Sequence, residues 1–288
     1  MPQVPNKVAE RIAAGIKRFQ PILASAKSRD VGESDTVIIV TDILSEVFGY
    51  DKYSEITSET SIRGTWCDLA IKLDGAIEFL IEVKAIGSEL KDAHTKQAVD
   101  YSANQGTDWV ILTNAETWRI YKVTFSKPID HELVLEIKFS QMNPKKSSDI
   151  ELLYHLTREG WLRSALGEFH TQQQALSRFF LGAVLLSDPV LEIVRRELRR
   201  FSPDVKINAE QIKSVLAQEV LKRDVVEGEK ADEARKKHNK AASRLLRAKS
   251  SKAPSGRPAA PSSSPAPERT EEETEETQTG VVDENPDS

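Results

Sequence analysis

Residues 66–86 read WCDLAIKLDGAIEFLIEVKAI, and the fold prediction starts from this stretch. Apolar side chains alternate with other side chains on both sides of an Asp74-Gly75 pair. A period of two is typical of β-strands, and Asp-Gly is a strong signal for a two-residue hairpin turn. The stretch therefore predicts two strands, over residues 66–73 and 77–86, that are antiparallel neighbours in a sheet.

Strand and helix patterns continue on both sides of this hairpin. Residues 53–59 predict a short edge strand, and residues 89–104 predict a helix. Residues 108–115 are apolar on both faces, which is typical of a central strand, and residues 117–125 alternate and pair with it. Residues 132–139 predict a further strand or a packed extension. We expect an α/β fold with a mixed central sheet flanked by helices.

Two helices are predicted before the sheet. Apolar residues recur every three to four positions over residues 5–27, which predicts a helix that kinks or ends at Pro21. The same period predicts a second helix that begins near Glu33 and ends before Gly49. We therefore assign residues 1–30 to an N-terminal helix and residues 31–140 to the α/β domain.

The sequence pattern of the second half of the chain changes at two points. Residues 147–225 have helical periodicity and form a predicted helical region. Residues 228–257 hold ten Lys and Arg against three acidic residues, a Pro/Ser/Ala-rich linker follows, and residues 268–288 hold nine acidic residues and one Arg. Such a composition cannot bury enough apolar surface to fold alone. We expect a disordered charged tail over residues 228–288.

Composition excludes several classes of protein. Cys67 is the single cysteine, so the chain can form neither an internal disulfide nor a cysteine-rich zinc site. The N-terminus mixes charges into its apolar residues, unlike a secretory signal, and the longest apolar run, residues 179–186, is too short to cross a bilayer. We expect a cytoplasmic protein without a membrane partner. Its net charge is −5, so any nucleic-acid site must be a local basic patch.

The chemistry-bearing residues lie in the predicted hairpin. Glu82 and Lys84 are two residues apart on one strand, so their side chains share a face. Alone, this pair indicates no more than a solvated charge pair. Asp68 lies on the neighbouring strand, on the face without large apolar residues, and the Asp74-Gly75 turn can bring it beside Glu82.

Two converging carboxylates are suitable ligands for Mg²⁺ or Mn²⁺, because these cations prefer oxygen. A neighbouring lysine would offset the repulsion between the carboxylates and could hold a water or a developing negative charge. A metal ion, a water and a positively charged group are what phosphodiester hydrolysis requires. We therefore predict Asp68 and Glu82 as metal ligands and Lys84 as a catalytic residue.

Two further residues are candidates for the site. Glu33 begins the second helix on the same face as Val37 and Val40, which predicts an inward-facing carboxylate; the alternative is an acid placed to suit the helix dipole. Gln97 lies on the helix after the Glu-x-Lys strand and could orient a water or contact phosphate. An ordinary polar helix position is the equal alternative for Gln97.

Residues 33–123 resemble the PD-(D/E)XK nuclease domain at the N-terminus of type I restriction enzyme R subunits. The matching stretches are the helix from Glu33 to Tyr50, IRGTWCDLAIKL, FLIEVKA and KQAVDYSANQGTDWVILTNAETWRIYKV. The last stretch is the most specific, because in such domains a helix with Gln and Tyr leads into an apolar strand that ends in Thr-Asn, followed by a strand with Trp. Here these residues are Gln97, Tyr101, Thr113, Asn114 and Trp118.

The resemblance implies a restriction-endonuclease-like fold, a divalent metal and cleavage of double-stranded DNA. Carried over by position, Asp68 and Glu82 match the metal ligands, Lys84 the catalytic lysine, Glu33 the helix carboxylate and Gln97 the motif glutamine. Full-length R subunits also carry an ATP-driven motor, whereas this chain contains no G-x-x-x-x-G-K-[ST] loop. We therefore expect no translocation by that route.

The leading hypothesis is a Mg²⁺-dependent endonuclease that hydrolyses DNA, in a restriction system or in defence against foreign DNA. The alternative is a non-catalytic module of the same fold that binds nucleic acid or a protein partner, including a second copy of the chain. The cluster RRELRRF at residues 195–201 is either a phosphate-contacting stripe or a solvated helix face.

Overall fold

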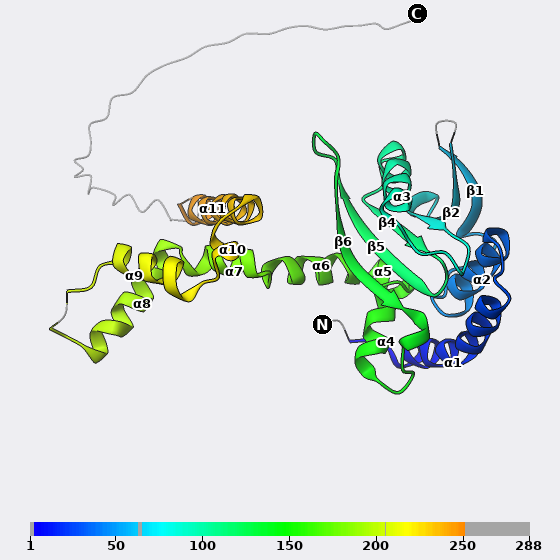
Figure 1. Ribbon diagram of the computed structural model, residues 1–288, viewed down its shortest axis with the longest axis horizontal. Helices are drawn as coiled ribbons and strands as arrows, with labels where there is room; N and C mark the ends of the chain where they lie inside the picture. Colours follow the sequence, from blue (N-terminus) through cyan, green and yellow to red (C-terminus); the bar gives the residue numbers. More distant parts are fainter. Residues whose placement is uncertain (1–2, 63–64, 205, 251–288) are drawn as a thin grey trace, which may run out of the picture. The chain divides into compact units, whose positions relative to one another are not determined.

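The computed structural model describes residues 3–62, 65–204 and 206–250 (Figure 1). Two helices come first, α1 (Asn6–Ser28) and α2 (Glu33–Glu46). The α/β part continues with β1 (Ile56–Ile62), β2 (Thr65–Leu73), β3 (Ala76–Val83), α3 (Asp92–Gln105), β4 (Trp109–Thr113), β5 (Thr117–Thr124), β6 (Asp130–Lys138) and the short helix η1 (Phe139–Gln141). The fold class is therefore mixed α/β.

The six strands form one mixed sheet in the order β1-β2-β3-β4-β5-β6. Strands β3 and β4 are parallel, because α3 connects them as a crossover, and every other neighbouring pair is antiparallel. The β2–β3 turn holds Asp74 at φ 48° and Gly75 at φ 82°, the left-handed conformations that a two-residue hairpin requires. The predicted hairpin, the edge position of β1 and the central position of β4 are confirmed, and residues 130–138 form a strand.

The sheet is covered on both faces (Figure 1). On one face, side chains such as Ile71, Ile81 and Trp118 pack with the buried residues of α1, α2 and α4 (Ser147–Tyr154) in the larger apolar cluster. On the other face, Leu80 and Leu112 pack against the helix α3. Burial on both faces explains why the central strands read as almost continuous apolar runs.

Helix α1 passes through Pro21 and ends at Ser28, so the end predicted at Pro21 is not found. Proline removes one backbone donor from a helix. However, Phe19, Leu23 and Ala26 are all buried, and they lie on both sides of the proline. Packing of these residues against the core compensates for the missing hydrogen bond and keeps the helix continuous.

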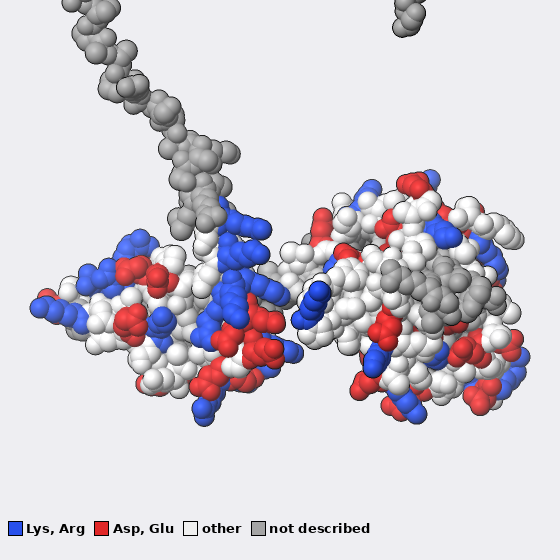
Figure 2. All heavy atoms as spheres, turned by 90° about the horizontal axis from the view of Figure 1, so that it is seen from above, with Lys and Arg blue, Asp and Glu red and all other residues white. Residues whose placement is uncertain are grey.

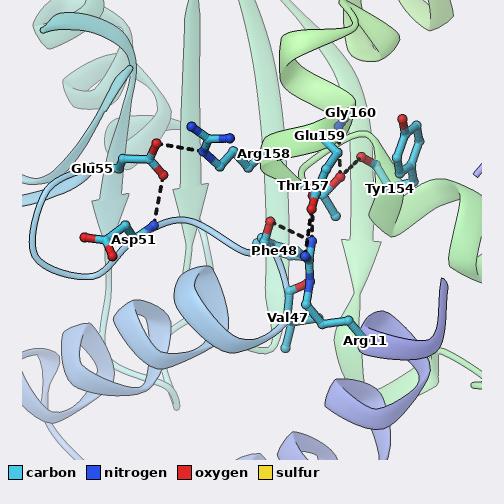
Figure 3. Close-up of polar contacts among 10 residues, drawn as sticks. All are labelled: Arg11, Val47, Phe48, Asp51, Glu55, Tyr154, Thr157, Arg158, Glu159 and Gly160. Carbon is cyan, nitrogen blue, oxygen red and sulfur yellow. Dashed lines mark hydrogen bonds and ion pairs between the residues drawn. The ribbon is translucent and has the colours of Figure 1, made fainter. Parts of the chain in front are cut away.

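An arginine connects three segments beneath the sheet (Figure 3). The guanidinium of Arg11, on α1, donates to Glu159 Oε1 at 2.8 Å and to Glu159 Oε2 at 2.7 Å. It also donates to the carbonyl oxygens of Val47 at 3.0 Å and Phe48 at 3.2 Å, which follow α2. Because Glu159 lies on the short helix α5 (Arg158–Leu162), the bidentate contact joins α1 to α5, and the two carbonyl contacts join α1 to the end of α2.

Helices occupy the segment after the sheet, as its periodicity predicts. After α4 and α5 they are α6 (Ala165–Ala175), α7 (Arg178–Leu185), α8 (Asp188–Phe201), α9 (Ala209–Val215), the π-helical turn η2 (Leu216–Val220) and α10 (Arg223–Val226). Within the described residues, no helix combines the length and the apolar character of a membrane span.

The charged segment differs from the prediction of disorder from residue 228 onward. Helix α11 spans Glu229–Ser250, and the chain divides into two units, Met1–His238 and Asn239–Ser288. Ala, Lys, Arg and Glu, which are strong helix formers, dominate this stretch, and Ala231 and Ala234 are buried. The prediction is therefore corrected for residues 229–250. Its remainder, residues 251–288, lies outside the described residues.

Candidate active site

Four of the five predicted site residues come from the start of β2, the end of β3 and the first turn of α2, and the fifth, Gln97, lies on α3. Glu82 is on β3, opposite Leu112 of the parallel strand β4. Lys84 follows the last residue of β3, and its backbone N–H donates to the carbonyl oxygen of Thr113 at 2.8 Å. This contact extends the β3–β4 ladder by one step and keeps Lys84 in line with Glu82, as the alternation predicts.

Asp68 reaches across to the neighbouring strand. Its Oδ2 accepts a hydrogen bond of 2.7 Å from the backbone N–H of Val83. The side chains of Asp68 and Glu82 therefore meet at the same end of adjacent strands, as the hairpin predicts. Burial raises the pKa of Asp68 above its ordinary value, although the Val83 N–H and the Lys84 ammonium act in the opposite direction.

Glu82 is the most deeply buried carboxylate of the group. Its Oε1 accepts a hydrogen bond of 2.6 Å from Lys84 Nζ. Its Oε2 is buried and has no hydrogen-bond partner within the described residues. A buried carboxylate oxygen without a partner is costly, because water no longer solvates it. This oxygen is therefore a place where a cation would be stabilised.

Glu33 adds a third carboxylate. Its Oε2 lies 3.7 Å from Lys84 Nζ, and about half of its side-chain surface is exposed (49%). One ammonium group therefore faces the carboxylates of Glu33, Asp68 and Glu82. If all four groups are ionised, the cluster has an excess of negative charge, and an additional cation would neutralise it.

The pKa values of Glu82 and Lys84 reflect the excess of negative charge in the cluster. The pKa of Glu82 is raised to about 7, mainly by burial and to a smaller extent by the charges of Asp68 and Glu33, against the opposing effect of the hydrogen bond and charge of Lys84. Burial lowers the pKa of Lys84, but the hydrogen bond and charge of Glu82, with Glu33 and Asp68, outweigh it and leave the pKa raised. The lysine thus remains an ammonium beside a carboxylate whose charge is only weakly stabilised.

Gln97 stands apart from this group. The residue is exposed on α3, and its amide donates to the hydroxyl of Tyr101, one turn along the same helix, at 2.9 Å. Across the part of the chain that the structure describes, no polar contact connects Gln97 to Asp68, Glu82 or Lys84. The structure therefore brings together four of the five predicted site residues.

Two residues that the sequence analysis did not assign to the site hold its backbone in place. Thr36 is buried in α2, and its hydroxyl oxygen accepts from the backbone N–H of Ile86 at 3.1 Å. The amide of Asn114 donates to the carbonyl oxygen of Ser88 at 2.8 Å. A polar residue three positions after Glu33, on the buried side of the helix, was the available signal for Thr36.

Asp68 and Glu82 offer carboxylate oxygens, the kind of donor that magnesium prefers in proteins. Within residues 3–62, 65–204 and 206–250, no group of three or more His, Cys, Asp or Glu side chains has the arrangement of a metal centre. Mg²⁺, however, keeps several waters and is commonly bound by one or two carboxylates together with phosphate oxygens. The pair of Asp68 and Glu82 meets that requirement.

Comparisons of the chain with protein-family models, with curated proteins and with solved structures found no match. The chemistry of the site itself is therefore the basis for assigning a function.

Proposed function

We propose that the chain is a divalent-metal-dependent nuclease that hydrolyses phosphodiester bonds in DNA. The observation that supports this most strongly is the state of Glu82, whose Oε2 is buried without a hydrogen-bond partner in the described structure while Oε1 contacts Lys84. A charge pair with only a structural role would satisfy both oxygens. Here one oxygen is left for another ligand.

Asp68 and Glu82 would hold Mg²⁺ or Mn²⁺. Both are carboxylates, they lie on adjacent strands, and the pKa of each is raised mainly by burial, so a bound cation would stabilise their charged forms. When bound, such a cation polarises the phosphate and lowers the pKa of a coordinated water.

Lys84 supplies a positive charge from the protein itself, in addition to that of the proposed cation. Its ammonium donates to Glu82 at 2.6 Å and can turn toward a water or toward a phosphate oxygen, because Lys84 Nζ has three donors. In this position it would orient the attacking water and stabilise the negative charge that develops on the phosphate. The charge of Glu33, 3.7 Å from Lys84 Nζ, adds to the effect of Glu82 in raising the pKa of the lysine.

The fold part of the proposal is a restriction-endonuclease-like domain over residues 31–140. A hairpin that leads into a parallel β3–α3–β4 unit, with the carboxylates at one end of the sheet, supports it together with the resemblance over residues 33–123. A role in restriction or in defence against foreign DNA rests on that resemblance.

Cleavage of supercoiled plasmid tests the activity. Wild-type protein should convert plasmid to nicked and linear forms in Mg²⁺ and should be inactive in EDTA. Glu82→Gln preserves size and removes charge, so cleavage should fall by at least a hundredfold. Glu116→Gln is the matched control, because Glu116 also accepts from a lysine, Lys27, at 2.6 Å but lies outside the site; its cleavage rate should equal that of wild type.

Two outcomes would overturn the proposal. One is equal cleavage by wild type and Glu82→Gln, which would indicate a contaminating nuclease. The other is no cleavage of DNA by wild type in either Mg²⁺ or Mn²⁺, which would leave the chain as a binding module of the same fold.

A further inference from the structure

The helix α8 carries an unusual group of cations. Its sequence from 192 to 201 is EIVRRELRRF, and its only basic residues are four arginines, Arg195, Arg196, Arg199 and Arg200. With 3.6 residues per turn, Arg195 and Arg199 lie one above the other, and so do Arg196 and Arg200 in the adjacent column. Leu191 and Leu198 lie together on another side of the helix, and Leu191 is buried. The four arginines thus form one side of the helix, the arginine face of α8, on which Arg195 is partly buried and the other three are exposed.

Neighbouring acids neutralise this face only in part. Arg195 pairs with Glu192 at 2.6 Å, and Arg200 pairs with Glu197 at 2.8 Å. The Arg196 guanidinium shares Glu197 at the longer distance of 3.7 Å. Arg199 has no carboxylate within ion-pair distance among the described residues. Four guanidinium groups therefore face two carboxylates, and the face keeps a net positive charge.

The helix dipole accounts for only half of these arginines. Arg199 and Arg200 are in the last turn of α8, where cations are favoured by the negative end of the helix. Arg195 and Arg196 lie one turn earlier, where this effect has faded. Exposed ion pairs contribute about 0–1 kcal/mol each, so stability alone does not explain a run of four arginines.

Three of the arginines also line a hollow in the surface. A hollow of about 300 Å³ is lined by Arg195, Arg196 and Arg199, together with Glu192 and Ile193. Figure 2 shows Lys and Arg side chains mixed with Asp and Glu side chains over the helices that follow the sheet, α11 included. Arginine binds phosphate better than lysine does, because its planar fork of donors matches two oxygens at once.

We infer that the arginine face of α8 binds the phosphate backbone of double-stranded DNA and holds the substrate of the proposed nuclease. The inference rests on the proposed function for its choice of ligand. Residues 1–227 carry a net negative charge, so a DNA contact in this part of the chain requires a local concentration of cations, and α8 supplies one. The contact is independent of base sequence, because it involves phosphates.

Binding of a fluorescein-labelled 30-base-pair duplex, followed by anisotropy in EDTA at several salt concentrations, tests this inference without cleavage. Replacing the four arginines by Ala should weaken binding at least tenfold. The slope of log Kd against log salt should fall by about 0.9 for each phosphate that the variant no longer neutralises, and thus by roughly 2 to 4 in total. Circular dichroism should be unchanged, because alanine favours helix.

Two further variants separate the charge of the arginines from their shape, and their position from the total charge of the protein. Replacing the same arginines by Lys keeps the charge, so the salt slope should stay within roughly 0.9 of the wild-type value, which is the equivalent of one phosphate. A charge-matched variant removes four exposed cations from α1 and the residue that follows it, and it should bind as wild type does; the substituted residues are Lys7, Lys17, Arg18 and Arg29.

The outcomes separate this inference from the proposed function. The inference is overturned if wild type does not bind the duplex, if the α8 Ala variant keeps the wild-type slope, or if the α1 variant is weakened as much as the α8 Ala variant. An unchanged slope in the α8 Ala variant would place the contact elsewhere, for example in the basic residues 228–257. Because binding is measured in EDTA, where no cleavage takes place, a failure of cleavage leaves the binding result intact.

Discussion

Glu82 and Lys84 form a 2.6 Å hydrogen bond that uses only one of the two carboxylate oxygens, and the other oxygen is buried without a partner in the described structure. The lysine is thus close enough to hold the carboxylate in place, but it does not saturate it. With Asp68 on the adjacent strand and Glu33 at 3.7 Å from the same lysine, the group is short of positive charge. Under the proposed function, a bound cation would supply the missing positive charge.

Glu82→Gln should therefore stabilise the metal-free protein. Because burial raises the pKa of Glu82 to about 7, its ionisation costs folding free energy above the unfolded pKa. Wild type should lose stability relative to the variant as pH rises from about 4.5 to 7, by on the order of 2–3 kcal/mol, and the difference between them should no longer change with pH below that range. Urea denaturation in EDTA at pH 5 and pH 8 measures it.

The matched control should behave in the opposite way. The hydrogen bond from Lys27 lowers the pKa of Glu116, so its carboxylate stabilises the fold above its unfolded pKa, and Glu116→Gln should slightly destabilise the protein at pH 8. Equal effects of the two substitutions at pH 8 would contradict the pKa assignment for Glu82.

Thr36 should position the site without taking part in the chemistry. Thr36→Val keeps the shape of the side chain but leaves the buried N–H of Ile86 without its acceptor, at a cost of about 1–3 kcal/mol. The start of α2, and Glu33 with it, would then be less firmly tied to the chain that follows Lys84. Cleavage should fall at a temperature where the variant is still folded, and Thr36→Ser should restore it; full activity in Thr36→Val would show that the link is not needed.

Arg11 should contribute to stability through the shape of its guanidinium. Arg11→Lys preserves the charge but cannot contact both oxygens of Glu159 and the Val47 carbonyl together, so unfolding should become easier by about 1–3 kcal/mol. Urea denaturation measures the change. If Arg11→Lys destabilises the protein by the same amount in a Glu159→Gln background, the contact between the two residues is not the source of the effect.

The hairpin and its polar face could be predicted because they depend on local rules. Alternation placed Glu82 and Lys84 on one face, and Asp74-Gly75 placed Asp68 on the adjacent strand. The contacts that complete the site are not local. The bond from Val83 N–H to Asp68 depends on where the β2 chain lies against the end of β3, and the bond from Ile86 N–H to Thr36 joins segments fifty residues apart in sequence.

Tertiary packing explains the places where the structure differs from a prediction based on local sequence rules. Pro21 predicts a kink or an end of the helix, and the end is not found, because the apolar residues on both sides of the proline are buried in the same core. Gln97 occupies the helix position that the resemblance indicates, yet its amide bonds to Tyr101 and the side chain is exposed. A periodic pattern shows which helix face carries a residue, but not how far that face lies from a site on the sheet.

Titration of the protein with Mn²⁺ by calorimetry, in the presence of a short duplex, is the direct test of a metal site at Asp68 and Glu82. Wild type should bind the metal, and Glu82→Gln should bind it roughly 100-fold more weakly, because the variant lacks one of the two carboxylate ligands. Lys84→Ala should still bind Mn²⁺, since an ammonium is not a ligand, yet it should not cleave plasmid. If wild type binds no metal with DNA present, or if Glu82→Gln binds it as tightly as wild type, Asp68 and Glu82 are not a metal site.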